Sequence, residues 1–182
     1  IKYQMIKELY EHAYIDSELF QKENRISPAT YYRRISELND LLEEYYLVIK
    51  RNRIQGEEKQ IRYFFYIFFW GIEENKDFLD NSTKQQYDLF FDTLQKKMKI
   101  NFDTSSILQM KMWLEISDSR LAWRKQFMFS NTYETMERPL LNQIREVFEN
   151  APLNRKERNS QNEILMFYDF FVSTKMFSSV SS

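Results

Sequence analysis

The sequence predicts a mainly α-helical fold: a winged helix-turn-helix with a short β-hairpin wing, followed by an all-helical bundle. The chain of 182 residues contains only 2 glycines and 3 prolines, which leaves few of the tight turns that an all-β fold requires. Through most of the chain, apolar residues recur at the three- and four-residue spacing of amphipathic helices. One short stretch, residues 47–56, departs from that spacing and resembles two strands joined by a turn.

Residues 1–72 are expected to form the winged domain together with the helix that leaves it. Helices are predicted over residues 2–14 and 15–22, and a third begins at Ser27 and Pro28. Ser27 can accept hydrogen bonds from free N–H groups at the start of this third helix. Pro28 suits the first helical position, because the N–H that proline lacks is not needed there.

The wing is predicted from residues 47–56. Residues 47–51 form the first strand in this interpretation, Asn52 and Arg53 form the turn, and residues 54–56 form the returning strand.

The remainder of the chain is expected to form a second domain. Residues 73–82 are polar and acidic, and they predict a linker. Residues 83–182 contain four helical stretches with short connections, which favours a compact helical bundle. Pro139 lies inside the third stretch, so a break is expected just before it. The stretches cover residues 83–98, 105–129, 133–148 and 162–177.

The helix that starts near Glu57 carries aromatic residues on nearly every side: Tyr63, Phe65, Tyr66, Phe68, Phe69 and Trp70. This pattern predicts a helix buried on several sides, packed between the two domains. The alternative is that part of its surface is a dimer interface. Three further aromatic residues, Trp113, Trp123 and Phe127, are expected to belong to the core rather than to a ligand cage.

The third helix and the wing supply a candidate DNA-binding surface. A helix fits the major groove, and the residues near its N-terminus reach the base edges. Arginine side chains can bind guanine or phosphate, and hydroxyl groups can bind the sugar–phosphate backbone. The candidates are Ser27, Thr30, Tyr32, Arg33 and Arg34 on the helix, and Lys50, Arg51 and Arg53 on the wing. The alternative is that these residues form only a solvated basic rim.

Composition excludes several other functions. There is no cysteine, and the only histidine is His12, so thiol chemistry, a cysteine or histidine metal site and a histidine-dependent triad are not expected. The acidic residues Glu73, Glu74, Asp77 and Asp80 are best explained as solvated loop residues. We therefore predict no enzyme activity, no metal and no cofactor. No apolar run reaches the length of a membrane span, so a cytoplasmic location is expected.

Two motifs in this region resemble the Mga/AtxA group of transcription regulators. The first is Ser27, Thr30 and Arg33 in the third helix, and the second is Gly56, Glu58, Ile61 and Arg62. The match extends over residues 15–72. The resemblance implies a DNA-binding activator, often linked to carbohydrate supply or virulence, and a phosphotransferase-system regulation domain (PRD) at residues 83–182. It also implies a homodimer, further domains on both sides of these residues, and phosphotransferase-system proteins as partners of those other parts.

The chain departs from the family in one respect. PRDs of this family are typically controlled by phosphorylation of histidines, whereas no histidine lies between Ala13 and Ser182. We therefore expect no phosphorylation site in the PRD-like part, and we regard His12 as a partly exposed helix residue. The alternative function is a protein–protein interaction or sugar-sensing helical module without DNA binding of its own.

Overall fold

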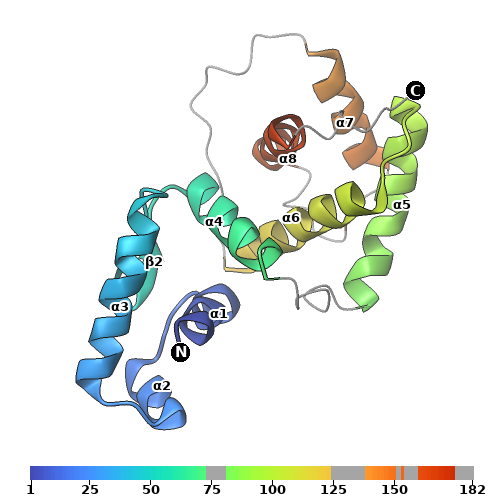
Figure 1. The fold of residues 1–182 in the computed structure, drawn as a ribbon. Coiled ribbons are helices and arrows are strands. Elements are labelled where there is room, and N and C mark those ends of the chain that lie inside the picture. The colour runs from blue at the N-terminus through green and yellow to red at the C-terminus, as the bar shows by residue number, and fades with distance from the viewer. Residues whose placement is uncertain (73–80, 124–137, 151–152, 154–159, 175–182) are drawn as a thin grey trace.

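The computed structural model describes residues 1–72, 81–123, 138–150, 153 and 160–174, with side chains from residue 87 onward in the second range. The described part is mainly helical and contains one small antiparallel hairpin, as the sequence predicts (Figure 1). Along the chain, the elements are α1 (Lys2–His12), α2 (Ser17–Asn24), α3 (Pro28–Glu43), β1 (Val48–Lys50), β2 (Arg53–Gln55), α4 (Glu58–Trp70), α5 (Asn81–Met98), α6 (Thr104–Ala122), α7 (Pro139–Asn150) and α8 (Gln161–Ser173).

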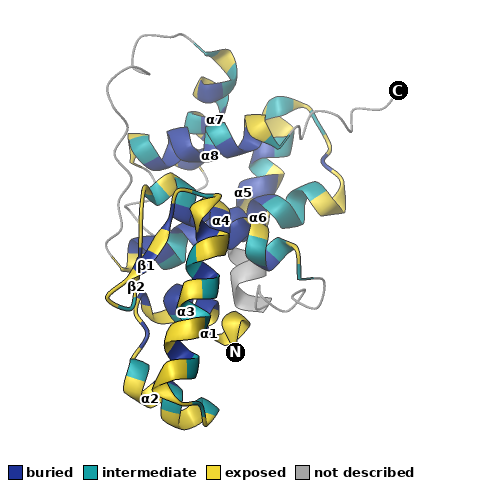
Figure 2. Cartoon of the chain, turned by 60° about the vertical axis from the view of Figure 1, so that its left-hand side comes forward, coloured by how far each residue is buried: buried dark blue, intermediate teal, exposed yellow. Residues whose placement is uncertain are grey.

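The second and third helices each begin at a residue whose side chain caps the helix. The carboxylate of Asp16 accepts hydrogen bonds from the N–H groups of Glu18 and Leu19, and it thereby caps α2. Ser27 caps α3 in the same way, and Pro28 occupies its first turn. α3 buries one face and leaves the opposite face exposed to solvent (Figure 2).

The hairpin is present, but its predicted turn at Asn52 and Arg53 is wrong by one residue. Ile49 pairs with Ile54, so the turn consists of Arg51 and Asn52, both of which have positive φ angles. A two-residue turn of this kind matches the twist of the two strands. A turn at Asn52 and Arg53 would place Ile54 opposite Arg51, and the two buried isoleucines would no longer face each other.

The last four helices, α5 to α8, pack together around an aromatic core. The ring of Phe90 on α5 lies 4.8 Å from that of Phe148 on α7 and 5.6 Å from that of Phe167 on α8, measured between centroids. α7 begins at Pro139, the residue before which a break is expected, and residues 133–137 of that predicted stretch lie outside the described part. α5 begins at Asn81, inside the predicted linker 73–82, whose residues 73–80 lie outside the described part.

α4 lies between the winged part and the helical bundle, and this confirms its prediction as a helix buried on several sides. On one side, Phe65 and Phe69 contact the ring of Tyr10 on α1 at centroid distances of 5.4 and 5.0 Å. On another side, Tyr66 contacts Trp113 on α6 and Phe170 on α8. The aromatic residues of α4 thus join the two parts of the chain.

The expectation for the other large aromatic residues is confirmed only in part. Trp113 is buried, as expected of a core residue. Trp123 is 43% exposed, contrary to its predicted place in the core, because α6 ends at Ala122 and the next residue no longer follows the buried face. Phe127 lies outside the described residues.

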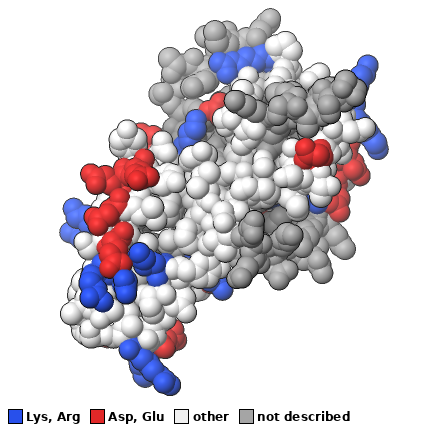
Figure 3. All heavy atoms as spheres, viewed as in Figure 1, with Lys and Arg blue, Asp and Glu red and all other residues white. Residues whose placement is uncertain are grey.

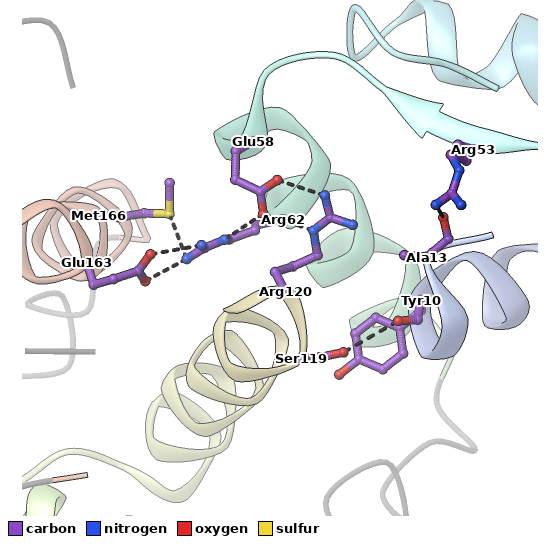
Figure 4. A network of polar contacts seen from close by, with 9 residues as sticks. All are labelled: Tyr10, Ala13, Arg53, Glu58, Arg62, Ser119, Arg120, Glu163 and Met166. Carbon is purple, nitrogen blue, oxygen red and sulfur yellow. Dashed lines mark hydrogen bonds and ion pairs between the residues drawn. The ribbon is translucent and has the colours of Figure 1, made fainter. Parts of the chain in front are cut away.

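A buried network of charged side chains ties α4 to α6 and α8 (Figure 4). The guanidinium of Arg62 is completely buried, and it donates hydrogen bonds of 2.7 and 2.9 Å to the two carboxylate oxygens of Glu163 on α8. Arg62 also donates to Glu58, one turn earlier on α4. Glu58 in turn accepts hydrogen bonds of 2.9 and 2.7 Å from Arg120 on α6. Glu58 and Arg62 are two residues of the second sequence motif, and both belong to this network.

We expect the substitution Arg62→Met to destabilise the fold by roughly 3–5 kcal/mol, because it leaves the carboxylate of Glu163 buried without its partner. Urea denaturation measures the free energy of unfolding. Lys7→Met is the control, because the pair Lys7–Glu11 is exposed and its loss should change the stability by less than about 1 kcal/mol. Equal effects of the two substitutions would contradict this view of the network.

Candidate nucleic-acid interface

The connection between α2 and α3 forms the corner of a helix-turn-helix. Arg25, which follows α2, adopts the left-handed conformation with φ 52°, and its N–H bonds back to the last turn of the helix. The N–H of Ile26 donates to the carbonyl of Gln21 over 3.0 Å. Only a few residues therefore separate the two helices, and the N-terminal turn of α3 is left exposed at the edge of the molecule.

Ser27 and Thr30 stabilise the start of α3. The N–H of Thr30 donates to the Ser27 hydroxyl over 3.2 Å, and the two hydroxyl groups lie 3.1 Å apart. The hydrogen bonds of Ser27 and Thr30 therefore stabilise the first turn of α3. Pro28 has no N–H group, and the N–H groups of Thr30 and Tyr31 both bond to Ser27. The N–H of Ala29 is therefore the group of this first turn that remains for a phosphate.

The two adjacent arginines of α3 have different surroundings. Arg33 is exposed, and none of the ion pairs between described residues includes it. Arg34 lies about 100° further round the helix, where its guanidinium donates hydrogen bonds of 2.8 and 2.9 Å to the carboxylate of Glu37. Lys2 of α1 approaches the same carboxylate to 3.3 Å. Arg33 is therefore available to a ligand, whereas Arg34 is already paired.

The charge of Glu37 is part of this arrangement. The hydrogen bond from Arg34 and a weaker interaction with Lys2 hold the pKa of Glu37 below its usual range. Glu37 is therefore ionised at neutral pH and neutralises the guanidinium of Arg34. An incoming phosphate would have to compete with this carboxylate for Arg34.

The C-terminal half of α3 is acidic. Asp40, Glu43 and Glu44 are exposed beyond Glu37, and Figure 3 shows acidic side chains gathered over this part of α3, with Lys and Arg side chains below them (Figure 3). Negative side chains repel the phosphates of nucleic acid. The charge pattern therefore favours an approach through the N-terminal half of α3 alone.

The wing is held against α3 and does not extend freely from the domain. Tyr31 of α3 donates a hydrogen bond from its hydroxyl to the carboxamide oxygen of Asn52 in the turn, over 2.9 Å. The carbonyl of Asn52 accepts a hydrogen bond from the N–H of Ile15. At the other side of the hairpin, the carboxamide of Asn39 accepts a hydrogen bond from the N–H of Ile49 and donates one to its carbonyl, at 2.6 and 3.2 Å.

The three basic residues of the wing, Lys50, Arg51 and Arg53, have different surroundings. Lys50 and Arg51 are exposed, and no ion pair between described residues includes either. Arg53 lies in β2 rather than in the turn, donates to the carbonyl of Ala13 over 3.4 Å, and lies 5.0 Å from the centre of the Tyr14 ring. Tyr32, on α3, is 63% exposed next to the buried Tyr31. Four of the predicted site residues are thus exposed, and no ion pair or hydrogen bond from another described residue holds their side chains: Tyr32, Arg33, Lys50 and Arg51.

Periodicity indicates which face of α3 is buried, but not the hydrogen-bond partner of a hydroxyl group. Sequence reasoning therefore did not foresee the contacts of Tyr31, Asn39 and Asn52 that hold this surface together, although it placed Asn52 in the turn. It also missed Arg25, an exposed cation at the corner between α2 and α3. A basic residue next to Ser27-Pro28 was a signal that could have identified Arg25.

Other kinds of site are not found in the described residues. These residues contain no group of histidine, cysteine, aspartate or glutamate side chains that could hold a metal ion. Among the same residues, no helix has the length and hydrophobicity needed to cross a membrane. His12, at the end of α1, is largely exposed and lies 3.9 Å from Glu8.

Comparison with known proteins gives a family match to the N-terminal part of the chain. No curated protein matches the chain. Residues 1–69, which comprise α1 to α3, the hairpin and nearly all of α4, match the family model described as the Mga helix-turn-helix domain. The matched family is one of DNA-binding regulators and not of enzymes. The N-terminal part of the chain is therefore similar to a DNA-binding domain of the Mga family.

Proposed function

We propose that this chain is a DNA-binding transcription regulator of the Mga type, in which α3 enters the major groove. The observation that supports this most strongly is the exposed N-terminal half of α3, with Arg33 unpaired beside a capped helix start, inside the region that matches the Mga helix-turn-helix model. The acidic second half of the helix supports an approach of the DNA to its N-terminal half.

In this proposal, most contacts are made to phosphates. The start of α3, where Ala29 keeps a free N–H group, binds one phosphate, and Lys50 and Arg51 of the wing bind others. Arg33 is the principal candidate for reading a guanine, while Tyr32 and Thr30 flank it on the helix. A single available arginine on the recognition helix implies limited base reading, so one domain alone should bind weakly and with little sequence preference.

The helical part, beginning at α5, is the proposed PRD-like regulatory domain. It would act on DNA binding through α4, which contacts both α1 and the bundle. A homodimer would fix the spacing of two winged domains on the promoter, and the regulator would then act as an activator. Phosphotransferase-system proteins remain proposed partners for parts of the protein outside these residues.

The proposal predicts a difference between the two arginines of α3. We expect Arg33→Ala to weaken binding to duplex DNA and to make the log–log salt dependence shallower by about 0.9 for each phosphate that the variant no longer neutralises. Arg34→Ala should have a smaller effect, because Glu37 already neutralises that guanidinium. Fluorescence anisotropy at several salt concentrations measures both quantities.

The same titration can refute the proposal. If the unmodified chain does not bind duplex DNA even at about 50 mM salt, this segment is not a DNA-binding module. If Arg34→Ala weakens DNA binding more than Arg33→Ala does, Arg33 is not the arginine of α3 that is available to DNA.

The wing position can be tested by removing one hydroxyl group. Tyr31→Phe keeps the ring but deletes the hydrogen bond to Asn52, so we expect a loss of about 0.5–1.5 kcal/mol in unfolding free energy together with weaker DNA binding. Tyr45→Phe is the matched control, because it also lies against the winged core and no described residue bonds its hydroxyl. Identical DNA affinity and stability in the two variants would show that the wing does not depend on Tyr31.

The absence of histidine from residues 13–182 gives a further prediction. Incubation of the chain with the histidine phosphotransfer protein, labelled phosphoenolpyruvate and the enzyme that transfers the phosphoryl group between them should leave these residues unlabelled. Peptide mapping locates any label, and His12→Gln shows whether His12 contributes. Acid-labile phosphate within residues 13–182 would contradict the expectation that the helical part is not itself a phosphohistidine sensor.

A further inference from the structure

A groove of about 710 Å³ opens between α4 and α8, with residues of α6 at its base. It lies on the bundle side of α4, away from the helix-turn-helix corner. Its volume is within the range of about 300–1,000 Å³ that is usual for sites that bind small molecules. The described residues that line it come mainly from α4 and α8, so an occupant would contact both helices.

The base and one wall of the groove are aromatic. Trp113 of α6 stacks on Phe170 of α8, with ring centroids 4.4 Å apart and an angle of 8° between the planes. Tyr66 of α4 meets the same Phe170 edge-on at 4.9 Å. Tyr63, one turn earlier on α4, is 41% exposed and also lines the groove. Trp113, Tyr66 and Phe170 are almost fully buried and form a rigid base, so Tyr63 and the half-buried Tyr168 present the accessible aromatic surface.

Several polar groups that line the groove are not used by the protein. Tyr66 is only 5% exposed, yet its hydroxyl has no hydrogen-bond partner among the described residues. Burial raises the pKa of Tyr66 far above its usual value, so the hydroxyl keeps its proton and can donate it. The carboxamides of Gln60 on α4 and Gln109 on α6 line the same groove and are also without a hydrogen-bond partner among the described residues. Gln60 and Gln109 are partly exposed to solvent, whereas a hydroxyl as buried as that of Tyr66 normally has a partner.

Charged side chains occupy the rim. Lys59 of α4 donates to the carboxylate of Asp169 on α8 over 3.0 Å, across the groove. Arg138, just before α7, lies with its guanidinium 5.6 Å from the centre of the Tyr168 ring. Cations and an anion are therefore both present, so the rim does not select strongly for one sign of charge.

We propose that this groove binds a carbohydrate ring. The C–H faces of a sugar pack on aromatic rings, and its neighbouring hydroxyl groups need partners that both donate and accept. Carboxamides and phenols do both, and Gln60, Tyr66 and Gln109 present such groups together. The ring could belong to a free sugar or to a phosphorylated one, whose phosphate would bind Arg138 or compete with Asp169 for Lys59. An occupied groove would link α4 to α8, and on the proposed function it would thereby change how the DNA-binding part is held.

Isothermal titration of the chain tests the site directly. The probes are neutral monosaccharides (glucose, galactose, mannose and N-acetylglucosamine) and their 6-phosphates, each up to about 10 mM. The groove variants are Tyr66→Phe and Gln109→Leu. Their matched controls are Tyr45→Phe and Gln143→Leu, whose positions do not line the groove. Arg138→Gln tests whether Arg138 binds the phosphate of a phosphorylated sugar.

We expect at least one sugar to bind, with affinity reduced roughly 5- to 10-fold by Tyr66→Phe or Gln109→Leu and unchanged in the controls. If only phosphorylated sugars bind and Arg138→Gln weakens them, the ligand is a sugar phosphate. The proposal is overturned if no probe binds, or if binding is the same in the groove variants and the controls. Because no DNA is present, failure of this test is distinct from failure of the DNA-binding proposal.

Discussion

The guanidinium of Arg62 is fully buried where α4, α6 and α8 meet, and a charge in such a place must be compensated by the protein. The compensation comes from Glu163 on α8 and from Glu58, which is itself held by Arg120 on α6. Because these hydrogen bonds are directional and shielded from water, they restrict how α4 can lie on the bundle. Apolar contacts alone would allow α4 to slide or rotate at smaller cost, so the ion pairs specify one arrangement.

The position of the candidate DNA surface follows from that of α4 through a continuous set of contacts. Phe65 and Phe69 of α4 pack on Tyr10 of α1, and Lys2 at the start of α1 reaches Glu37 of α3. Glu37 binds Arg34 and leaves Arg33 as the exposed cation of the helix. A hydroxyl of α6 also contacts α1 directly, since Ser119 donates to the carbonyl of Tyr10. The bundle and the recognition helix are therefore physically connected, and an occupant of the groove would act on one end of that connection.

The sequence was sufficient to predict those parts of the fold that depend only on interactions between neighbouring residues. Ser27 and Pro28 identify the start of α3, and the change of periodicity after it identifies the hairpin. The turn was misplaced because register depends on Ile49 facing Ile54, which the sequence of the turn does not reveal. The hydrogen bond from Tyr31 to Asn52, the pairing of Arg34 with Glu37 and the pair Arg62–Glu163 were not foreseen, because each requires knowledge of side-chain direction or of distant packing. From the sequence, Arg33 and Arg34 of α3 were equivalent candidates for DNA binding. In the structure, Arg34 is paired with Glu37, whereas Arg33 is exposed.

The central claim, that the buried network around Arg62 fixes the winged part on the helical bundle, can be tested by measuring a distance between the two parts. The chain has no cysteine, so spin labels can be attached at cysteines introduced for the exposed residues Ser36 on α3 and Leu89 on α5, and double electron–electron resonance then reports the distance distribution. We predict one narrow distribution in the otherwise unchanged chain, which broadens when Arg62→Met is added. A broad or multiple distribution before that substitution, or the same narrow one after it, would contradict the claim.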